Sequence, residues 1–530
     1  MANLFGTDGI RGRVSIDSCD DEEALSRLVE ERLFTPQLMK LLGEALGRCL
    51  PEGGEGSQVI IGWDERPHNE TLAAWLTLGL HASNCNVIHA GCVSTPMLHY
   101  AVLETNSRLG CMITASHNPV DDSGLKVFDS KGRKSMPAYE TLVSETAYSL
   151  SQEDREIDDD DRQAWMVPDS LHTVDHAHWL ERRLELAKPL FDSNLSGFNR
   201  IHLDSSKGHA AQWLAAWLQK QGLRVEEVSH RAVAMNDGCG AGELSPGQSW
   251  TWNEVGKSGH LLIESLSPQG HGSIVGAALD GDGDRCLLVR ETKNGVEVVD
   301  GDDIADAILR ACPRPWKVAA SIESNLKLLS GIEESVDMNG YETAVGDRWL
   351  SHALKPFLPN QNQQPLLFGI EDSGHIVFPS PHPFNNDAWS LVGDGAMTLL
   401  LALLAFQRTG NDLMEKGWKK RLSVKNPNRW MWDGTNELSD VVESMVRTHL
   451  EQAGDVTEWN RTGLEGESNL MLIRCQFNGM DVSFGVRNSG TQAKTSLSLR
   501  FSEPEPGFDA MLMMRSVQNL LLRTFNPVAH

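Results

Sequence analysis

Short apolar runs alternate with helical patterns along the first part of the chain. Leu38, Leu41, Leu42, Ala45 and Leu46 recur at helical spacing, which predicts a helix between residues 34 and 50. A β-rich run follows at 58–63, and the alternation continues through expected helices at 71–82 and 97–103 and expected strands at 86–90 and 110–114. Strands that alternate with helices indicate an α/β fold with a mostly parallel sheet.

The rest of the chain has the same character. Further α/β segments are expected from about residues 174 and 298, and a fourth segment from about 425. The expected helices are 177–190, 210–219, 396–406, 438–450 and 508–524, and the expected strands include 200–203, 223–228, 273–279, 318–322 and 366–370. The acidic stretch 149–162 predicts an exposed linker. Because 530 residues exceed what one core organises, we expect domains at 1–165, 166–297, 298–415 and 416–530.

Composition limits the compartment and the partners. The net charge of -26 would repel nucleic acid and anionic membrane surfaces, so neither is expected as a partner. Nine cysteines are scattered without a C-x-x-C pair, which favours a reducing compartment. No secretory signal and no apolar run of about 18 residues occur, so we expect a cytoplasmic protein. An anionic small molecule would need local cations and backbone amides that outweigh the global charge.

The strongest chemical signal is the run LDGDGDRC, which follows an expected strand. Asp280, Asp282 and Asp284 alternate with glycines that let the loop fold tightly, and three carboxylates converging there need a cation. Ligation by oxygen alone suits Mg²⁺. An EF-hand is disfavoured because position six is Arg285 rather than glycine and a strand, not a helix, enters the loop. We call residues 280–284 the aspartate loop.

A second candidate segment, TASHNP, follows the expected strand 110–114. It places Ser116 on a turn, where we expect its side chain to be exposed and able to meet a ligand. His117 is adjacent and Lys126 lies ten residues further on, so a base or a cation is expected near the hydroxyl. An ordinary turn is the alternative. We call residues 114–119 the serine loop.

Two more loops carry polar groups suited to a sugar phosphate. In GIEDSGH, Glu371, Ser373 and His375 alternate, which suits adjacent sugar hydroxyls, although a capped turn would look the same. In RNSGTQAK, a loop of hydroxyls and cations suits phosphate, with a polar turn as the alternative; its residues are Arg487, Asn488, Ser489, Gly490, Thr491 and Lys494. Neither a Walker loop nor a strand followed by G-x-G-x-x-G occurs. We call these the sugar loop and the terminal loop.

These four loops, in this order, resemble the α-D-phosphohexomutase superfamily. The resemblance extends from FGTDGIRG through GWDER, TAVGDRW and LVGDG to the terminal loop, and within the superfamily the opening, NDGCG and VGDRW are most similar to phosphoglucosamine mutases. It implies three α/β domains with mixed, mostly parallel sheets and a smaller C-terminal α+β domain around a central cleft. It also implies a mutase that interconverts hexose 6-phosphate and hexose 1-phosphate, with glucosamine phosphate as the expected substrate.

The resemblance further implies a role for each loop. Ser116 would carry the phosphoryl group and, through a phosphate oxygen, bind Mg²⁺ together with the three aspartates, while Lys126 or His117 assists proton transfer. Arg11, Arg285 and Arg348 would be additional cations. A hexose 1,6-bisphosphate would be both the intermediate and the activator. The protein is expected to be a monomer or a homodimer.

The sequence also departs from the family pattern. It has an insertion after Arg13, a diverged segment at 242–269, Gln492 and Ala493 in place of Glu-Pro, and Ser496 where an arginine is common. We expect Lys494 or Arg500 to supply the missing cation. Phosphoglucomutase or phosphomannomutase activity is the alternative within enzymes, and a catalytically silent sugar-phosphate-binding homologue is the alternative from another class.

Overall fold

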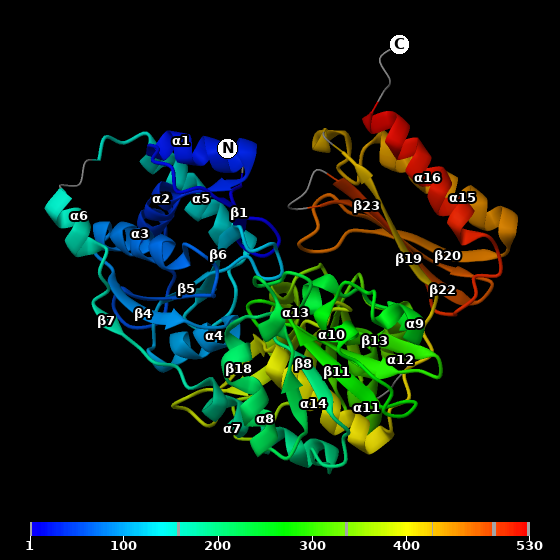
Figure 1. The fold of residues 1–530 in the computed structure, drawn as a ribbon. Coiled ribbons are helices and arrows are strands. Elements are labelled where there is room, and N and C mark those ends of the chain that lie inside the picture. Colours follow the sequence, from blue (N-terminus) through cyan, green and yellow to red (C-terminus); the bar gives the residue numbers. More distant parts are fainter. Residues whose placement is uncertain (1–2, 156–158, 334–337, 427, 490–493, 527–530) are drawn as a thin grey trace.

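Four β-sheets follow one another along the chain of this computed structural model (Figure 1). The structure describes residues 3–155, 159–333, 338–426, 428–489 and 494–526. We call the parts built on the sheets the first to fourth units. The first unit (blue to cyan) and the fourth unit (orange to red) stand on either side of the second and third units (green to yellow) (Figure 1). No helix of the described ranges is long and apolar enough to span a membrane.

The first sheet has the order β2-β1-β6-β5-β3-β4-β7. Its strands are β1 (Ile10–Val14), β2 (Leu33–Phe34), β3 (Gln58–Trp63), β4 (Asn86–Cys92), β5 (Leu109–Ile113), β6 (Asp122–Asp129) and β7 (Ser170–Leu171). Its helices are α1 (Asp21–Ser26), α2 (Pro36–Arg48), α3 (Asn69–Ala82), α4 (Thr95–Glu104), α5 (Pro137–Ser151) and α6 (Asp159–Trp165). Strands β5, β3 and β4 are parallel, whereas β6 is antiparallel to β5 and β1. The helices and strands predicted between residues 34 and 114 are confirmed.

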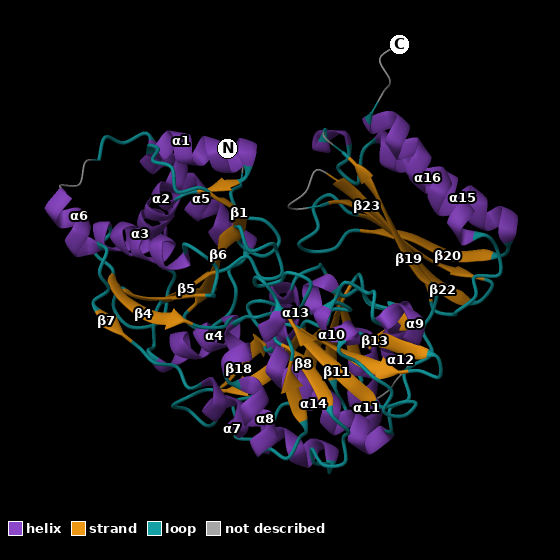
Figure 2. Ribbon diagram, viewed as in Figure 1, coloured by secondary structure: helices purple, strands orange, loops and turns teal. Residues whose placement is uncertain are grey.

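Local sequence signals explain where α2 forms. Thr35 caps it by accepting a hydrogen bond from the Leu38 amide at 3.1 Å, and Pro36 occupies the first turn. Its apolar residues are buried against α3, where glycine is required because a Cβ on Gly79 would lie 1.9 Å from the Lys40 carbonyl oxygen. Helices α2, α3 and α5 share one core on one face of the sheet, and α4 packs in a separate core (Figure 2).

Two segments differ from simple expectations. The insertion after Arg13 forms α1, a short π-helical turn and β2, which pairs in parallel with β1 and extends the sheet by one edge strand. The stretch 149–162 was predicted to be an exposed linker, but its start continues α5 to Ser151 and α6 begins at Asp159. The stretch is therefore partly helical in the described residues, and residues 156–158 lie outside them.

The second and third sheets have the orders β10-β13-β12-β11-β8-β9 and β15-β14-β16-β17-β18. The second-unit strands are β8 (Ile201–Asp204), β9 (Val225–Glu227), β10 (Ser249–Thr251), β11 (Ile274–Leu279), β12 (Cys286–Glu291) and β13 (Gly295–Val299). Those of the third unit are β14 (Lys317–Ser321), β15 (Asn339–Thr343), β16 (Leu367–Ile370), β17 (Ile376–Pro381) and β18 (Trp389–Gly393). Both sheets mix parallel and antiparallel pairs.

The second and third units share one hydrophobic core. Their helices are α7 (His176–Phe191), α8 (Leu214–Lys220), α9 (Trp252–Val255), α10 (Leu261–Glu264), α11 (Gly301–Ala311), α12 (Leu326–Glu333), α13 (Asp347–Leu354) and α14 (Gly395–Thr409). The predicted helix 210–219 is partly wrong: it forms as a 3₁₀ turn, His209–Gln212, followed by α8. Trp213, with φ of -140°, interrupts the helical backbone between them.

The fourth sheet is antiparallel throughout, in the order β19-β23-β22-β21-β20. Its strands are β19 (Lys419–Lys425), β20 (Val456–Thr462), β21 (Met471–Phe477), β22 (Met480–Asn488) and β23 (Lys494–Phe501). Helices α15 (Glu437–Ala453) and α16 (Ala510–Phe525) lie side by side on one face and close a separate core (Figure 2). The predicted α/β fold with a C-terminal α+β unit is therefore confirmed.

Asp394, from the LVGDG motif, anchors the long helix α14. Its Oδ1 accepts hydrogen bonds from the amides of Ala396 and Met397 at 3.0 and 3.2 Å. Its Oδ2 accepts from Arg183 Nη1 at 2.6 Å and contacts His176 Nε2 at 3.0 Å, and all three side chains are buried. Burial would raise the pKa of Asp394, but His176 and Arg183 outweigh it and lower that pKa to about 2.

We expect Asp394→Ala to lower the free energy of unfolding by about 3–5 kcal/mol, because Arg183 would stay buried without its anion. The stabilisation by the Asp394 carboxylate is present above its unfolded pKa of about 3.9 and is lost as pH falls towards 2. Urea unfolding at pH 7 measures the first effect. The exposed Asp387 provides a control, whose alanine variant should stay within about 0.5 kcal/mol of the parent. Equal losses in both variants would contradict the assignment.

Candidate active site

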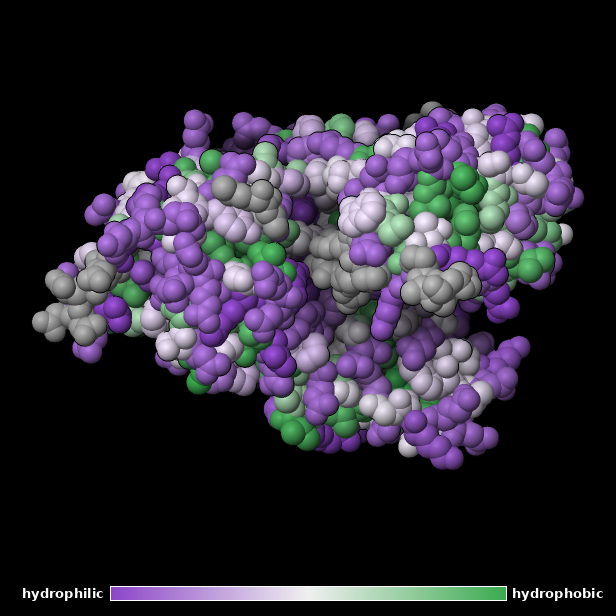
Figure 3. Space-filling model, turned by 90° about the horizontal axis from the view of Figure 1, so that it is seen from above, coloured by the Kyte–Doolittle hydropathy of each residue, from purple (hydrophilic) through white to green (hydrophobic). Residues whose placement is uncertain are grey.

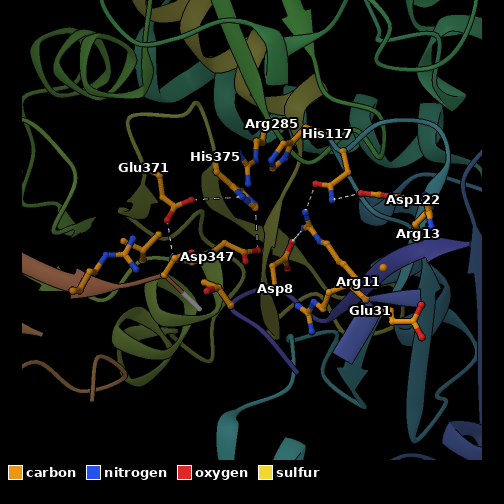
Figure 4. A pocket seen from close by; sticks show the side chains of 18 residues that line it. Asp8, Arg11, Arg13, Glu31, His117, Asp122, Arg285, Asp347, Glu371 and His375 are labelled. Atoms are coloured by element: carbon orange, nitrogen blue, oxygen red, sulfur yellow. Dashed lines mark hydrogen bonds and ion pairs between the residues drawn. The ribbon is translucent and has the colours of Figure 1, made fainter. Parts of the chain in front are cut away.

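A cavity of about 490 Å³ lies where the four units meet. Seen from above, the surface is hollowed between the first and fourth units (Figure 3). Its lining includes Arg11 and His117 from the first unit, Arg285 from the second, and Glu371 and His375 from the third (Figure 4). Arg487 lines it from the fourth unit. Five of these six side chains are arginines or histidines, and they face one cavity in a protein of strongly negative net charge.

The serine loop runs directly from β5 to the edge of this cavity. Ser116 has a φ of +53° and is fully buried, so the prediction that it is exposed is wrong. The aspartate loop covers it, and Ser116 Oγ donates a hydrogen bond to Asp280 Oδ2 at 2.8 Å. His117 Nδ1 lies 3.4 Å from the same hydroxyl and lines the cavity. The His117 side chain therefore lies next to both the Ser116 hydroxyl and the cavity.

Two motifs of the sequence, GWDER and NDGCG, hold this turn in place. Arg66, in GWDER, donates to the carbonyl oxygens of Ser116 and Asn118 at 2.7 and 2.8 Å. Asn236, in NDGCG, donates to the same two oxygens at 2.8 and 2.9 Å. A left-handed backbone at a non-glycine residue is maintained only where its surroundings fix it, and these four hydrogen bonds fix Ser116.

The aspartate loop is the turn between β11 and β12. One carboxylate oxygen from each of Asp280, Asp282 and Asp284 lies within 4.8 Å of the others, and all three residues are buried. Among the described residues, Asp282 Oδ1 and Asp284 Oδ1 have no hydrogen-bond partner although they are buried. Buried carboxylate oxygens without partners fit a divalent cation with oxygen ligands. Strands on both sides of the turn also exclude the helix–loop–helix of an EF-hand.

Lys126 and His117, the two candidates for proton transfer, differ in protonation: Lys126 is charged and His117 is neutral. Lys126 Nζ lies 2.7 Å from Asp282, 3.0 Å from Asp284 and 3.1 Å from Asp8. Burial would lower the pKa of Lys126, but these carboxylates raise it well above the usual value, so the amine holds its proton. Nearby Arg285, followed by burial, lowers the pKa of His117 to about 3. His117 is therefore neutral at pH 7, whereas Lys126 is charged.

The sugar loop is tied to the first unit by a chain of buried charges, of which Figure 4 shows His375, Asp347 and Asp8. His375 Nε2 lies 3.2 Å from Asp347, and Lys134 Nζ lies 2.8 Å from both Asp347 and Asp8. Burial would lower the pKa of His375, but Asp284 and Asp347 outweigh it and raise that pKa to about 9. Glu371 accepts a hydrogen bond from the Gly346 amide at 2.7 Å.

Sequence reasoning missed several residues of this site. Asp8 and Asp347 lie within FGTDG and VGDRW, so those motifs were an available signal, whereas nothing local marked Lys134. The insertion adds Glu31 and Arg32 to the cavity lining, next to Arg13.

Two residues predicted to bind substrate do not line the cavity. Arg348 is 9 % exposed and donates to Glu140 at 2.6 Å and to the Ser135 carbonyl at 3.2 Å. Its guanidinium therefore joins the third unit to the first instead of facing the cavity. Ser373 is half-buried on the turn and is absent from the lining. Glu371 and His375 are the sugar-loop residues that the structure brings to the cavity.

In the terminal loop, too, some of the predicted residues line the cavity and others do not. Arg487 and Ser489 line the cavity, and Arg487 pairs with Glu323 at 3.1 Å. Asn488 instead turns inwards and donates to the Trp432 carbonyl at 2.7 Å. Gly490 and Thr491 lie outside the described residues. Lys494 is half-buried at the start of β23, and its carbonyl accepts a hydrogen bond from the Ser489 amide at 2.9 Å.

The expectation that Arg500 reaches the substrate is wrong. Arg500 is 1 % exposed and donates to Glu342 at 2.8 Å, to Ser483 Oγ at 2.7 Å and to the Ser324 carbonyl at 3.0 Å. The alternation along β23 turns its guanidinium towards the edge of the third unit, where these acceptors satisfy it. Of the two residues proposed to replace the missing cation, Lys494 remains.

Comparisons with known proteins agree with this geometry. The models for phosphoglucomutase/phosphomannomutase alpha/beta/alpha domain I and domain III match residues 2–154 and 300–420, together more than half of the chain. A phosphoglucosamine mutase of Staphylococcus saprophyticus is 29% identical over 469 residues, which cover 86% of this chain and 90% of that protein.

Solved structures share the whole fold. A phosphoglucomutase/phosphomannomutase family protein of Burkholderia thailandensis superposes with a TM-score of 0.63 at 17% identity, covering 100% of this chain and 98% of its own. The Aspergillus fumigatus N-acetylphosphoglucosamine mutase, solved with GlcNAc-6P and magnesium, gives a TM-score of 0.55 at 14% identity, covering 96% and 100%. The chain therefore belongs to the phosphoglucomutase/phosphomannomutase family.

Proposed function

We propose that the protein is a phosphohexomutase that interconverts hexose 6-phosphate and hexose 1-phosphate through a phosphorylated Ser116. The observation that carries the proposal is the contact of Ser116 Oγ with Asp280, inside an aspartate loop that has unpartnered carboxylate oxygens. A hydroxyl in that position is surrounded by the groups that phosphoryl transfer requires: a metal site, fixed cations and a neutral base. A silent sugar-phosphate-binding protein would have no need for this arrangement.

Asp280, Asp282 and Asp284, with an oxygen of the Ser116 phosphate, would hold Mg²⁺. When bound, the ion neutralises charge that develops on the transferring phosphoryl group. Lys126 and Arg285 stay protonated and balance the remaining negative charge. His117, whose Nδ1 lies 3.4 Å from the Ser116 hydroxyl, would exchange the proton of the attacking or departing hydroxyl.

The proposed cycle moves a phosphoryl group and one proton in opposite directions. The phosphoryl group leaves Ser116 Oγ and bonds to the free hydroxyl oxygen of the sugar monophosphate, while the proton of that hydroxyl passes through the base to Ser116 Oγ; the products are a hexose 1,6-bisphosphate and a free serine. The bisphosphate then reorients in the cavity and returns its other phosphoryl group to Ser116 Oγ, whose proton passes through the base to the sugar oxygen that is left free. Glu371 and His375 are placed to hold the ring hydroxyls, and Arg487 and Ser489 to hold the phosphate that is not reacting.

Glucosamine 6-phosphate is the proposed substrate, because the curated relatives of this chain are phosphoglucosamine mutases that align over most of its length. A cytoplasmic location and a monomeric or homodimeric state also remain proposals from the sequence. The test is a coupled assay of the purified protein with Mg²⁺ and a trace of hexose 1,6-bisphosphate on glucosamine, glucose and mannose phosphates. The highest kcat/KM is expected with glucosamine phosphate. A preference for glucose or mannose phosphate would assign the alternative mutase, and no turnover of any of the three would overturn the proposal.

We expect Lys494→Ala to raise KM for every hexose phosphate at least about tenfold, as loss of a charge-assisted contact of roughly 1.5–3 kcal/mol requires. Sugar preference should not change, since a phosphate contact is common to all substrates. Steady-state kinetics measure both. Lys420→Ala, an exposed lysine on neighbouring β19, is the matched control and should resemble the parent. An unchanged KM for Lys494→Ala would remove Lys494 from the phosphate site.

A further inference from the structure

A second group of potential metal ligands lies between the first and second units, near the segments that pack against the aspartate loop. Glu65 follows β3, Cys92 is the last residue of β4, and His209 begins the 3₁₀ turn of the second unit. One ligand atom from each of the three residues lies within 4.8 Å of the others. The residues come from two units and from three distant parts of the sequence, so they meet only in the folded protein.

The contacts within this group leave ligand atoms available. His209 Nδ1 lies 3.2 Å from Glu65 Oε1, close to the roughly 3.4 Å that separates two ligands of a tetrahedral ion bound at about 2.1 Å. Glu65 Oε2 is buried and has no hydrogen-bond partner among the described residues. Cys92 is exposed, the only exposed residue of the nine cysteines, so an ion can reach the group from solvent.

From these contacts we infer that Glu65, Cys92 and His209 bind a zinc ion that joins the first and second units. One sulfur, one nitrogen and one oxygen ligand suit Zn²⁺, whereas Mg²⁺ prefers the all-oxygen aspartate loop. Three protein ligands leave the fourth tetrahedral position to water.

The position of the group links it to the aspartate loop. Three residues after Cys92, the Thr95 amide donates to the Asp282 carbonyl at 2.9 Å, and Thr95 Oγ1 donates to the Asp282 carboxylate. On the other side, Gly208 precedes His209 and packs so closely that a Cβ there would lie 2.2 Å from the Gly281 carbonyl oxygen. An ion at this site therefore fixes both segments that pack against the aspartate loop.

Cobalt provides a direct test, because thiolate ligation to Co²⁺ gives a charge-transfer absorption that carboxylate ligation does not. The full-length protein is titrated with Co²⁺ in excess Mg²⁺, which occupies the aspartate loop. We expect the absorption to saturate at one equivalent and to be displaced by Zn²⁺. Cys92→Ser should abolish it, Glu65→Gln and His209→Gln should weaken binding at least about tenfold, and Cys19→Ser, at a half-buried cysteine elsewhere, should leave it unchanged.

Alkylation of the parent protein provides a second test that needs no variant. Zn²⁺ should slow iodoacetamide labelling of Cys92, mapped by peptide mass, while the rates at Cys19 and Cys49 stay the same. No thiolate absorption in the parent, absorption that persists in Cys92→Ser, or labelling of Cys92 that is indifferent to Zn²⁺ would each overturn the inference.

Discussion

Ser116→Ala is expected to lower hexose phosphate turnover by more than about four orders of magnitude, because the acceptor of the phosphoryl group is removed. The folded state should persist, since the turn is held through backbone carbonyls by Arg66 and Asn236 and not through the Ser116 side chain. Coupled kinetics measure the loss. Intact-mass analysis should show one phosphate on a fraction of the parent protein as isolated and none on the variant.

Ser245→Ala, at an exposed loop serine, is the control and should keep both the phosphate and the activity. A phosphate mapped to another residue, or near-normal turnover by Ser116→Ala, would contradict the phosphoserine mechanism.

Asp282→Asn is expected to lower both the affinity for Mg²⁺ and kcat by about 10- to 100-fold. Asparagine keeps an oxygen for Lys126 and for Thr95, so the fold should be retained while one anionic ligand is lost. Chelator should reproduce the loss in the parent, and added Mg²⁺ should reverse it. Activity and isothermal titration with Mg²⁺ are the measurements.

Asp302→Asn is the matched control, because Asp302 is equally buried but lies on α11, outside the aspartate loop. Burial chiefly raises the pKa of Asp302 to about 7, so an amide there removes less charge at pH 7 than it would from a fully ionised carboxylate. Equal losses of activity in the two variants, or full activity in excess chelator, would count against the metal assignment.

Elements with a complete local signal could be predicted from the sequence. Residues 58–63 form β3 and residues 396–406 lie within α14 because their apolar patterns match a buried strand and a buried helix. The two-residue strands β2 and β7 had no such signal, since each exists only through pairing with a strand more than ten residues away. Pairing at a distance is a property of the folded chain.

In the site, too, residues with a local sequence signal could be predicted, whereas residues that depend on distant partners could not. Asp280, Asp282 and Asp284 were predictable because one short loop supplies all three carboxylates. Lys134 was not, because its partners Asp8 and Asp347 belong to different units and lie more than 120 residues away. Arg500 was misplaced because alternation along a strand assigns a face but does not identify what packs against that face.

The contact between Ser116 and Asp280 spans 164 residues, so synthesis of the chain separates the nucleophile from its activation in time. Domains generally fold as they emerge, N-terminal part first. The serine loop is thus made long before the aspartate loop, and a ribosome-bound first unit has the hydroxyl without the carboxylates around it. Under the proposed mechanism, a nascent chain or a fragment that ends before residue 280 therefore lacks the carboxylates that phosphoryl transfer at Ser116 requires.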